Sequence, residues 1–182
     1  MGTTKNKEIA MSWLQTFSGV KFDPLHPKKE DIRMLDIAHS LSMQCRFNGH
    51  VIRYYCVAEH SVTVSRILPE EYKLWGLLHD APEAYVSDLI RPVKEVISGY
   101  ADIEDHIMEM ICDIYGLSWP MPHEVKRADD ILLVTEKRDL LVPASGKWKI
   151  DEVPLEERIE PWTQEKAMIE FLRAMGEYGA KN

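Results

Sequence analysis

Histidine and aspartate side chains enter apolar parts of this sequence at three separate places. His60 lies in one apolar segment, the pair His79 and Asp80 directly follows the apolar run 74–78, and Asp129 lies in a third segment. Imidazole nitrogens and carboxylate oxygens are good ligands for divalent cations, and ionisable groups seldom enter apolar segments without a partner. We therefore interpret these four side chains as ligands of one divalent metal ion, which would be Mn²⁺, Co²⁺, Mg²⁺ or Zn²⁺.

A metal site of this kind would suit the hydrolysis of a phosphate ester. Four protein ligands on an octahedral ion leave positions for water and for a phosphate oxygen, and the ion lowers the pKa of water, so no nucleophilic serine or cysteine is required. The simpler alternative is that a His–Asp pair is common and that a buried histidine usually serves only as a hydrogen-bond partner. The polar cluster that continues with Glu83, Tyr85 and Asp88 favours the metal site.

The candidate ligands lie in segments that have the apolar periodicity of helices. Apolar side chains recur at helical spacing in the stretches 36–41, 57–68, 69–78, 103–116, 125–135 and 161–175. We expect Asp36 to cap the first of these helices, Gly116 to end the fourth and Pro161 to open the last. Because three different helices carry the ligands, packing can bring them together, and the expected fold class is all-α.

Little other regular structure is predicted. The stretch 16–22 alternates apolar and polar residues around Ser18 and Gly19, which indicates a small N-terminal β-hairpin. Residues 1–10 are expected to form a flexible tail, and residues 142–159, with two prolines and a glycine, to be irregular. The chain of 182 residues is expected to fold as a single domain around one core.

Composition limits the classes of partner. A formal charge of −8 argues against a protein that coats polymeric nucleic acid, although basic side chains can still converge on one nucleotide. No stretch is apolar enough, for long enough, to span a bilayer, so no membrane partner is expected. Cys45, Cys56 and Cys112 lack metal-binding spacing and are interpreted as reduced thiols of a cytoplasmic protein.

The order of the candidate ligands resembles the H…HD…D signature of HD-domain phosphohydrolases. Several stretches are similar, in order, to the short HD enzymes, which include bacterial 5'-deoxynucleotidases and the compact dATP triphosphohydrolases of phages. These stretches are Cys45–His50 (CRFNGH), Ala58–Val62 (AEHSV), Leu77–Tyr85 (LLHDAPEAY) and Asp88–Lys94 (DLIRPVK). The similarity covers residues 16 to 140 and implies the helical bundle of the HD domain, with the four candidate ligands on the metal.

The resemblance also implies roles for residues beside the metal. Asp129 matches the last metal ligand, and Asp130 is the alternative if the register differs by one. Glu83 matches a carboxylate near the metal, so that Glu83 and Asp80 are the catalytic candidates, with Glu83 as general acid or base. Arg46 matches an arginine that holds phosphate, a role that suits a guanidinium because it can bind two oxygens at once.

The remaining substrate-binding candidates follow from the same resemblance. Phe47 stands where family members often have a tryptophan against the base or sugar. Asp88 matches the residue that reads the sugar 3'-hydroxyl, and Pro92 lies where the base pocket is shaped. Lys94 is expected to be a second contact to phosphate.

The implied function is the metal-dependent hydrolysis of deoxyribonucleoside 5'-phosphates, with dATP triphosphohydrolase as the leading specific expectation. The alternatives are a 5'-deoxynucleotidase that acts on deoxynucleoside monophosphates, an HD hydrolase of a cyclic or guanosine tetraphosphate-like nucleotide, and a non-catalytic metal-binding module. A structural zinc site would normally be rich in thiols, which disfavours the last alternative. Related enzymes form dimers or hexamers, so we expect a homo-oligomer in the cytoplasm of a bacterium or of a phage-infected cell.

Overall fold

Helices form most of the structure, and a two-stranded hairpin lies near the N-terminus. The computed structural model describes residues 12–144, 146 and 148–179. Strand β1 (Leu14–Gln15) pairs in antiparallel fashion with β2 (Lys21–Phe22), with Leu14 opposite Phe22. The expected hairpin and the all-α fold class are both confirmed, whereas the tail expected at residues 1–10 lies outside the described residues.

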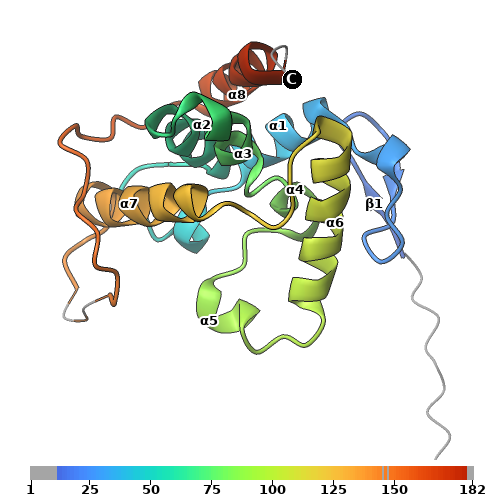
Figure 1. Cartoon of the computed structure of the whole chain (residues 1–182). Coiled ribbons are helices and arrows are strands. Elements are labelled where there is room, and N and C mark those ends of the chain that lie inside the picture. Colours follow the sequence, from blue (N-terminus) through green and yellow to red (C-terminus); the bar gives the residue numbers. More distant parts are fainter. Residues whose placement is uncertain (1–11, 145, 147, 180–182) are drawn as a thin grey trace, which may run out of the picture.

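The helices follow the hairpin in chain order (Figure 1). They are η1 (Lys29–Asp31), α1 (Met34–Met43), η2 (Arg46–Gly49), α2 (Val57–Ile67), η3 (Glu70–Tyr72), α3 (Lys73–Leu78), α4 (Glu83–Val86), α5 (Arg91–Lys94), α6 (Tyr100–Tyr115), α7 (His123–Leu140) and α8 (Gln164–Gly179). In the part of the chain that the structure describes, no helix is long and apolar enough to cross a membrane.

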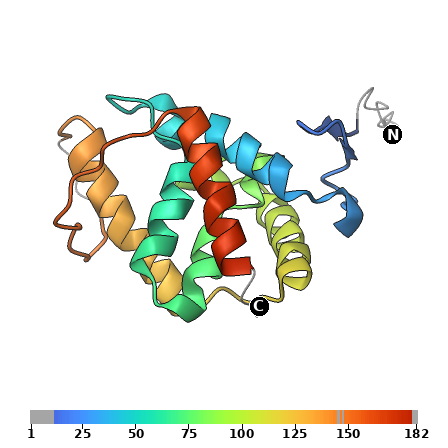
Figure 2. The ribbon, with the colours of Figure 1, turned by 90° about the horizontal axis from the view of Figure 1, so that it is seen from above.

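Helix α2 is at the centre of the packing. It contacts α1, α3, α7 and α8, and its residues Val57, Ala58, Val62 and Val64 are fully buried. Figure 2 shows α8 lying across α1, α2 and α3, so that α2 is covered on this side as well. A polar side chain on α2 is therefore surrounded by protein, which explains how His60 comes to be completely buried.

Helices α2 and α3 approach closely because Gly76 has no side chain. A Cβ atom added there would lie only 3.0 Å from the Cα atom of Ser65 on α2 and would also clash with the Leu68 side chain. This close approach sets the distance between His60 on α2 and His79, which directly follows α3. A packing glycine in the apolar run 74–78 thus helps to place a candidate ligand.

Two of the expected helix ends were wrong. The N-cap of α1 is Arg33 and not Asp36, because the buried carboxylate of Asp36 instead accepts hydrogen bonds from the backbone N–H (2.6 Å) and hydroxyl (2.8 Å) of Ser18. Helix α8 begins at Gln164, three residues after Pro161. Gly116 does end α6, in the left-handed conformation with a φ of 68°.

Residues 88–98, which include α5, form a largely exposed part of the wall around the candidate site, and we call them the α5 segment. Figure 1 shows α5 standing away from the packed helices. Four apolar side chains there are exposed to solvent: Ile90 (45%), Val93 (37%), Val96 (79%) and Ile97 (44%). The phenolic hydroxyl of Tyr100 donates to the carbonyl of Ser87 at 2.5 Å, which ties the two ends of the segment together.

Candidate metal centre

Four side chains from α2, α7 and the turn after α3 point their polar atoms at one place. His60 Nε2 lies 3.3 Å from His79 Nε2, 3.3 Å from Asp129 Oδ1 and 3.6 Å from Asp80 Oδ2. His79 Nε2 in turn lies 3.3 Å from Asp80 Oδ2. The ligand atoms of His60, His79 and Asp129 all lie within 4.8 Å of one another, so this group could hold a metal ion.

The hydrogen bonds on the outer side of each ring fix which nitrogen faces the centre. His79 Nδ1 donates to the carbonyl of Gly76 at 2.8 Å, and His60 Nδ1 donates to the carboxylate of Glu136 at 2.6 Å. Because both Nδ1 atoms carry hydrogen, the two Nε2 atoms of the neutral rings face each other with lone pairs. Two such acceptors 3.3 Å apart need a positive charge between them, either a proton or a cation.

The charges around His60 also favour a positive charge at the centre. Burial of the ring and the charge of Arg46 both disfavour the imidazolium form. The carboxylates of Glu136 and Asp129 outweigh them and raise the pKa of His60 to about 9. Burial would raise the pKa of Asp129, yet its bond to His60 holds that pKa well below the usual range. The centre thus attracts positive charge, and a metal ion would have to displace this proton.

The spacing of the donors suits a first-row divalent ion. Ligand atoms about 2.1 Å from such an ion, at tetrahedral or right angles to one another, are about 3.0 to 3.4 Å apart. The observed separations of 3.3–3.6 Å are close to this range. Two imidazoles and two carboxylates are a donor set that Mn²⁺, Co²⁺ and Zn²⁺ all accept.

A buried carboxylate on α7 links the centre to the candidate phosphate-binding residue. Glu136 is fully buried, and its Oε2 atom accepts hydrogen bonds from Arg46 Nε (3.3 Å) and Nη2 (3.1 Å). Arg46 also approaches Asp80, with Nη1 3.5 Å from Oδ2. Burial alone would lower the pKa of Arg46, but the carboxylates of Glu136, Asp80 and Asp129 raise it above its usual value. The guanidinium is therefore always charged beside the centre.

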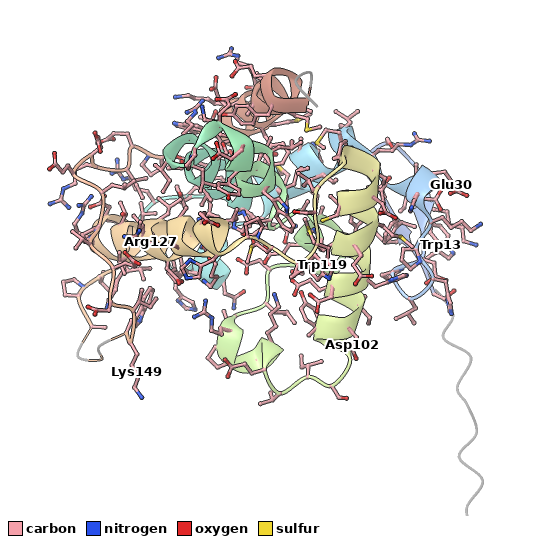
Figure 3. The ribbon with its side chains drawn as sticks, in the orientation of Figure 1. Trp13, Glu30, Asp102, Trp119, Arg127 and Lys149 are labelled. Carbon is pink, nitrogen blue, oxygen red and sulfur yellow. The ribbon has the colours of Figure 1, made fainter. Side chains whose placement is uncertain are left out.

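The centre opens into a cavity of about 790 Å³. The cavity is lined by the catalytic, substrate-binding and metal-binding candidates, with the exception of the fully buried His60. These lining residues are Arg46, Phe47, His79, Asp80, Glu83, Asp88, Pro92, Lys94 and Asp129. Trp119 and Lys149 are also part of its lining, and Figure 3 shows Trp119 near the middle of the molecule beside α6 and Lys149 at the lower left. A cavity of this size has room for a nucleotide.

Glu83 is placed to exchange a proton inside this cavity. Its side chain is 93% buried (7% exposed), and its Oε2 atom has no hydrogen-bond partner among the described residues. Burial, together with the nearby charges of Asp80 and Asp88, raises the pKa of Glu83 well above its usual value. These effects favour the protonated carboxyl group, which is the form that a general acid needs.

Aromatic and basic side chains cover the part of the cavity away from the centre. Phe47 adopts a left-handed backbone conformation with a φ of 54°, and its ring centroid lies 6.1 Å from that of Trp148. Lys94 Nζ forms a 2.5 Å ion pair with Glu104 Oε2 at the rim. Asp129 Oδ1 lies 3.3 Å from His60 Nε2, whereas Asp130, the alternative ligand, is not part of the group that could hold a metal ion, so the structure favours Asp129.

Sequence reasoning missed three residues of this site. Glu136, Lys126 and Trp148 were not singled out, although each lies at or beside the cavity. Glu136 could have been found, because it follows Asp129 by seven residues and therefore shares its helix face. Lys126 precedes Asp129 by one turn and donates to its Oδ2 atom at 2.9 Å. Trp148 lies in an irregular segment, where the spacing of residues carries no positional signal.

The fold and the site together define an all-α protein in which imidazole nitrogens and carboxylate oxygens meet beside a cavity. No family model matches the chain. It is 42% identical to the uncharacterized protein YfdR of Escherichia coli (strain K12) over 140 residues, which are 77% of this chain and 79% of YfdR. The chain therefore belongs to the YfdR family. It is also 37% identical to an uncharacterized protein of Rhodobacter capsulatus over 127 residues, which cover 64% of this chain and 65% of that protein.

Proposed function

We propose that this protein is a metal-dependent hydrolase of deoxyribonucleoside 5'-phosphates of the HD-domain type, and that dATP is its substrate. The observation that carries the proposal is the meeting of two imidazole Nε2 atoms and two carboxylates, within 3.3–3.6 Å, beside a charged arginine at the mouth of a cavity. The H…HD…D order of the same residues in the sequence supports it. A bound divalent ion would supply an activated water and would offset phosphate charge.

Three side chains could bind the phosphate, donate a proton to the leaving group and bind the sugar. Arg46 is oriented by Glu136 and can hold a phosphate group next to the centre. Glu83, whose raised pKa favours the protonated form, could protonate the departing 5'-oxygen of the nucleoside. Asp88 lines the cavity beside them, where it can accept a hydrogen bond from the sugar 3'-hydroxyl.

Basic residues favour a triphosphate over a monophosphate. In addition to Arg46, the cavity is lined by Arg91, Lys94, Lys126 and Lys149. A monophosphate held at the centre needs only one or two of these charges. These additional cations could bind β- and γ-phosphates, so release of triphosphate is the expected reaction.

A panel of nucleotides tests this proposal. The protein is incubated with each deoxynucleoside tri- and monophosphate and with ATP, in Mn²⁺, Co²⁺, Mg²⁺ or Zn²⁺, and the products are separated by chromatography. We expect deoxyadenosine and triphosphate from dATP, and little product from ATP. His106→Ala, at an exposed histidine on α6, is the matched control and should keep full activity. The absence of products from every nucleotide with every metal would overturn the proposal.

A further inference from the structure

Glu136 is a fully buried acid that bonds both to a candidate metal ligand and to the candidate phosphate-binding residue. Its Oε1 atom accepts the 2.6 Å bond from His60 Nδ1, and its Oε2 atom accepts two bonds from Arg46 at 3.1 and 3.3 Å. The side chain is fully buried and is not part of the cavity lining. It can therefore act on ligands in the cavity through these two neighbours.

Charge balance shows why one carboxylate serves both neighbours. The guanidinium of Arg46 and a metal ion at the centre would both carry positive charge, and both lie close to Asp80. Without a second anion, Arg46 would compete with the ion for the carboxylate of Asp80. Glu136 neutralises Arg46 from the side opposite the cavity, which leaves Asp80 available to the ion.

The bond to His60 has a separate effect. By accepting the Nδ1 hydrogen, Glu136 holds the ring in the tautomer whose Nε2 lone pair faces the centre, and it increases the basicity of that nitrogen. The same carboxylate thus sets the orientation of a metal ligand and the position of a phosphate ligand. A change in one of these bonds must change the other, because both oxygens belong to one rigid group.

We propose that Glu136 is a positioning residue that couples metal binding at His60 to phosphate binding at Arg46. This inference rests on the proposed function, because it takes the centre as a metal site and the cavity as a phosphate site. It adds that the two ligands bind cooperatively through a side chain that contacts neither. The closest matched control is Glu59, an equally buried acid on α2 whose carboxylate accepts the backbone N–H of Trp162 at 2.9 Å instead.

The test compares Glu136→Gln with Glu59→Gln. Isothermal titration measures the affinity of each full-length protein for Mn²⁺, and then the affinity of the Mn²⁺-loaded protein for inorganic phosphate. The glutamine amide can still accept the bond from His60, but it cannot neutralise Arg46. We expect Glu136→Gln to weaken both affinities by about 10- to 100-fold, and Glu59→Gln to change neither by more than about twofold.

A spectroscopic readout separates positioning from general damage. In the Co²⁺-loaded protein, the visible absorption bands report the geometry of the ligands, and we expect Glu136→Gln to shift them while circular dichroism stays unchanged. If Glu136→Gln does not fold, Glu136→Asp keeps the charge but shortens the reach to both neighbours, and it should weaken both affinities to an intermediate degree.

The outcomes distinguish this inference from the proposed function. If the wild-type protein binds Mn²⁺ and hydrolyses dATP while Glu136→Gln keeps both affinities, only the coupling is wrong. A loss of Mn²⁺ affinity with phosphate affinity intact also overturns the coupling. If the wild-type protein binds no divalent ion, the proposed function fails and this inference fails with it.

Discussion

The two ends of the cavity differ in how their side chains are held. At the candidate metal centre, His60 and His79 are 0% and 4% exposed, and each ring has a hydrogen bond on its outer nitrogen. At the other end, the α5 segment supplies Pro92 and Lys94 to the cavity while exposing Val96 by 79%. Under the proposed function, the reaction would depend on side chains fixed by the core, whereas substrate selection would depend on an exposed wall whose conformation can change at little free-energy cost.

The largest effect is expected when a candidate metal ligand is removed by substitution. Asp80→Ala should abolish Mn²⁺ binding and reduce turnover to background, because Asp80 approaches both Nε2 atoms. The chain should still fold, since the Asp80 side chain is 20% exposed and lies at the cavity surface. Calorimetry, activity and circular dichroism measure the three quantities. A folded variant with wild-type turnover would show that the centre is not catalytic.

A smaller effect on turnover is expected when the candidate metal ligands are intact but the proposed proton donor is missing. Glu83→Gln should lower kcat by about 10²- to 10⁴-fold, because an amide cannot transfer a proton to the leaving oxygen. The affinity of this variant for Mn²⁺ should stay within about threefold of wild type, since the atoms that converge on His60 Nε2 come from His79, Asp80 and Asp129. Steady-state kinetics on dATP and a metal titration give both values. Equal losses of kcat and of metal affinity would instead assign Glu83 to the metal.

A substitution in the α5 segment should weaken substrate binding more than it lowers the rate of turnover. Lys94→Ala removes a cation from the cavity, and we expect KM for dATP to rise about tenfold, which is about 1.4 kcal/mol, with kcat changed by less than about threefold. Lys29→Ala, which breaks an exposed ion pair with Asp113 away from the cavity, is the control and should leave KM unchanged. A fall in kcat at constant KM would contradict the division between the two ends.

The smallest effect concerns stability. Val96→Ser in the α5 segment should change the free energy of unfolding by no more than about 0.5 kcal/mol, because its side chain is already in water. Leu77→Ala, at a fully buried position two residues before His79, should cost about 2–5 kcal/mol. Denaturant titration measures both. Similar losses for the two variants would mean that the α5 segment is covered in solution.

Much of this architecture follows from local rules. The apolar periodicity at 103–116 predicted α6 and its end at Gly116, because a left-handed glycine is a local feature. Asp36 was misjudged as a helix cap because its partner, Ser18, lies eighteen residues away and belongs to the hairpin. No local pattern reports such a contact.

The site shows the same limit. His60, His79, Asp80 and Asp129 were found because charged groups stand out in apolar segments, and the structure brings them together. Glu136 was missed because its importance arises from Arg46, ninety residues earlier in the chain. Trp148 reaches the cavity on a segment without periodicity, so only the folded chain reveals it.

Helix α7 holds the His60 ring at both nitrogens, with Asp129 at Nε2 and Glu136 at Nδ1. These two acids are seven residues apart, which is almost two full turns, so they share one side of the helix. Inserting or deleting a single residue between them would rotate one acid by about 100° relative to the other. Substitutions between Asp129 and Glu136 can thus leave both contacts to His60 in place, whereas the insertion or deletion of one residue cannot.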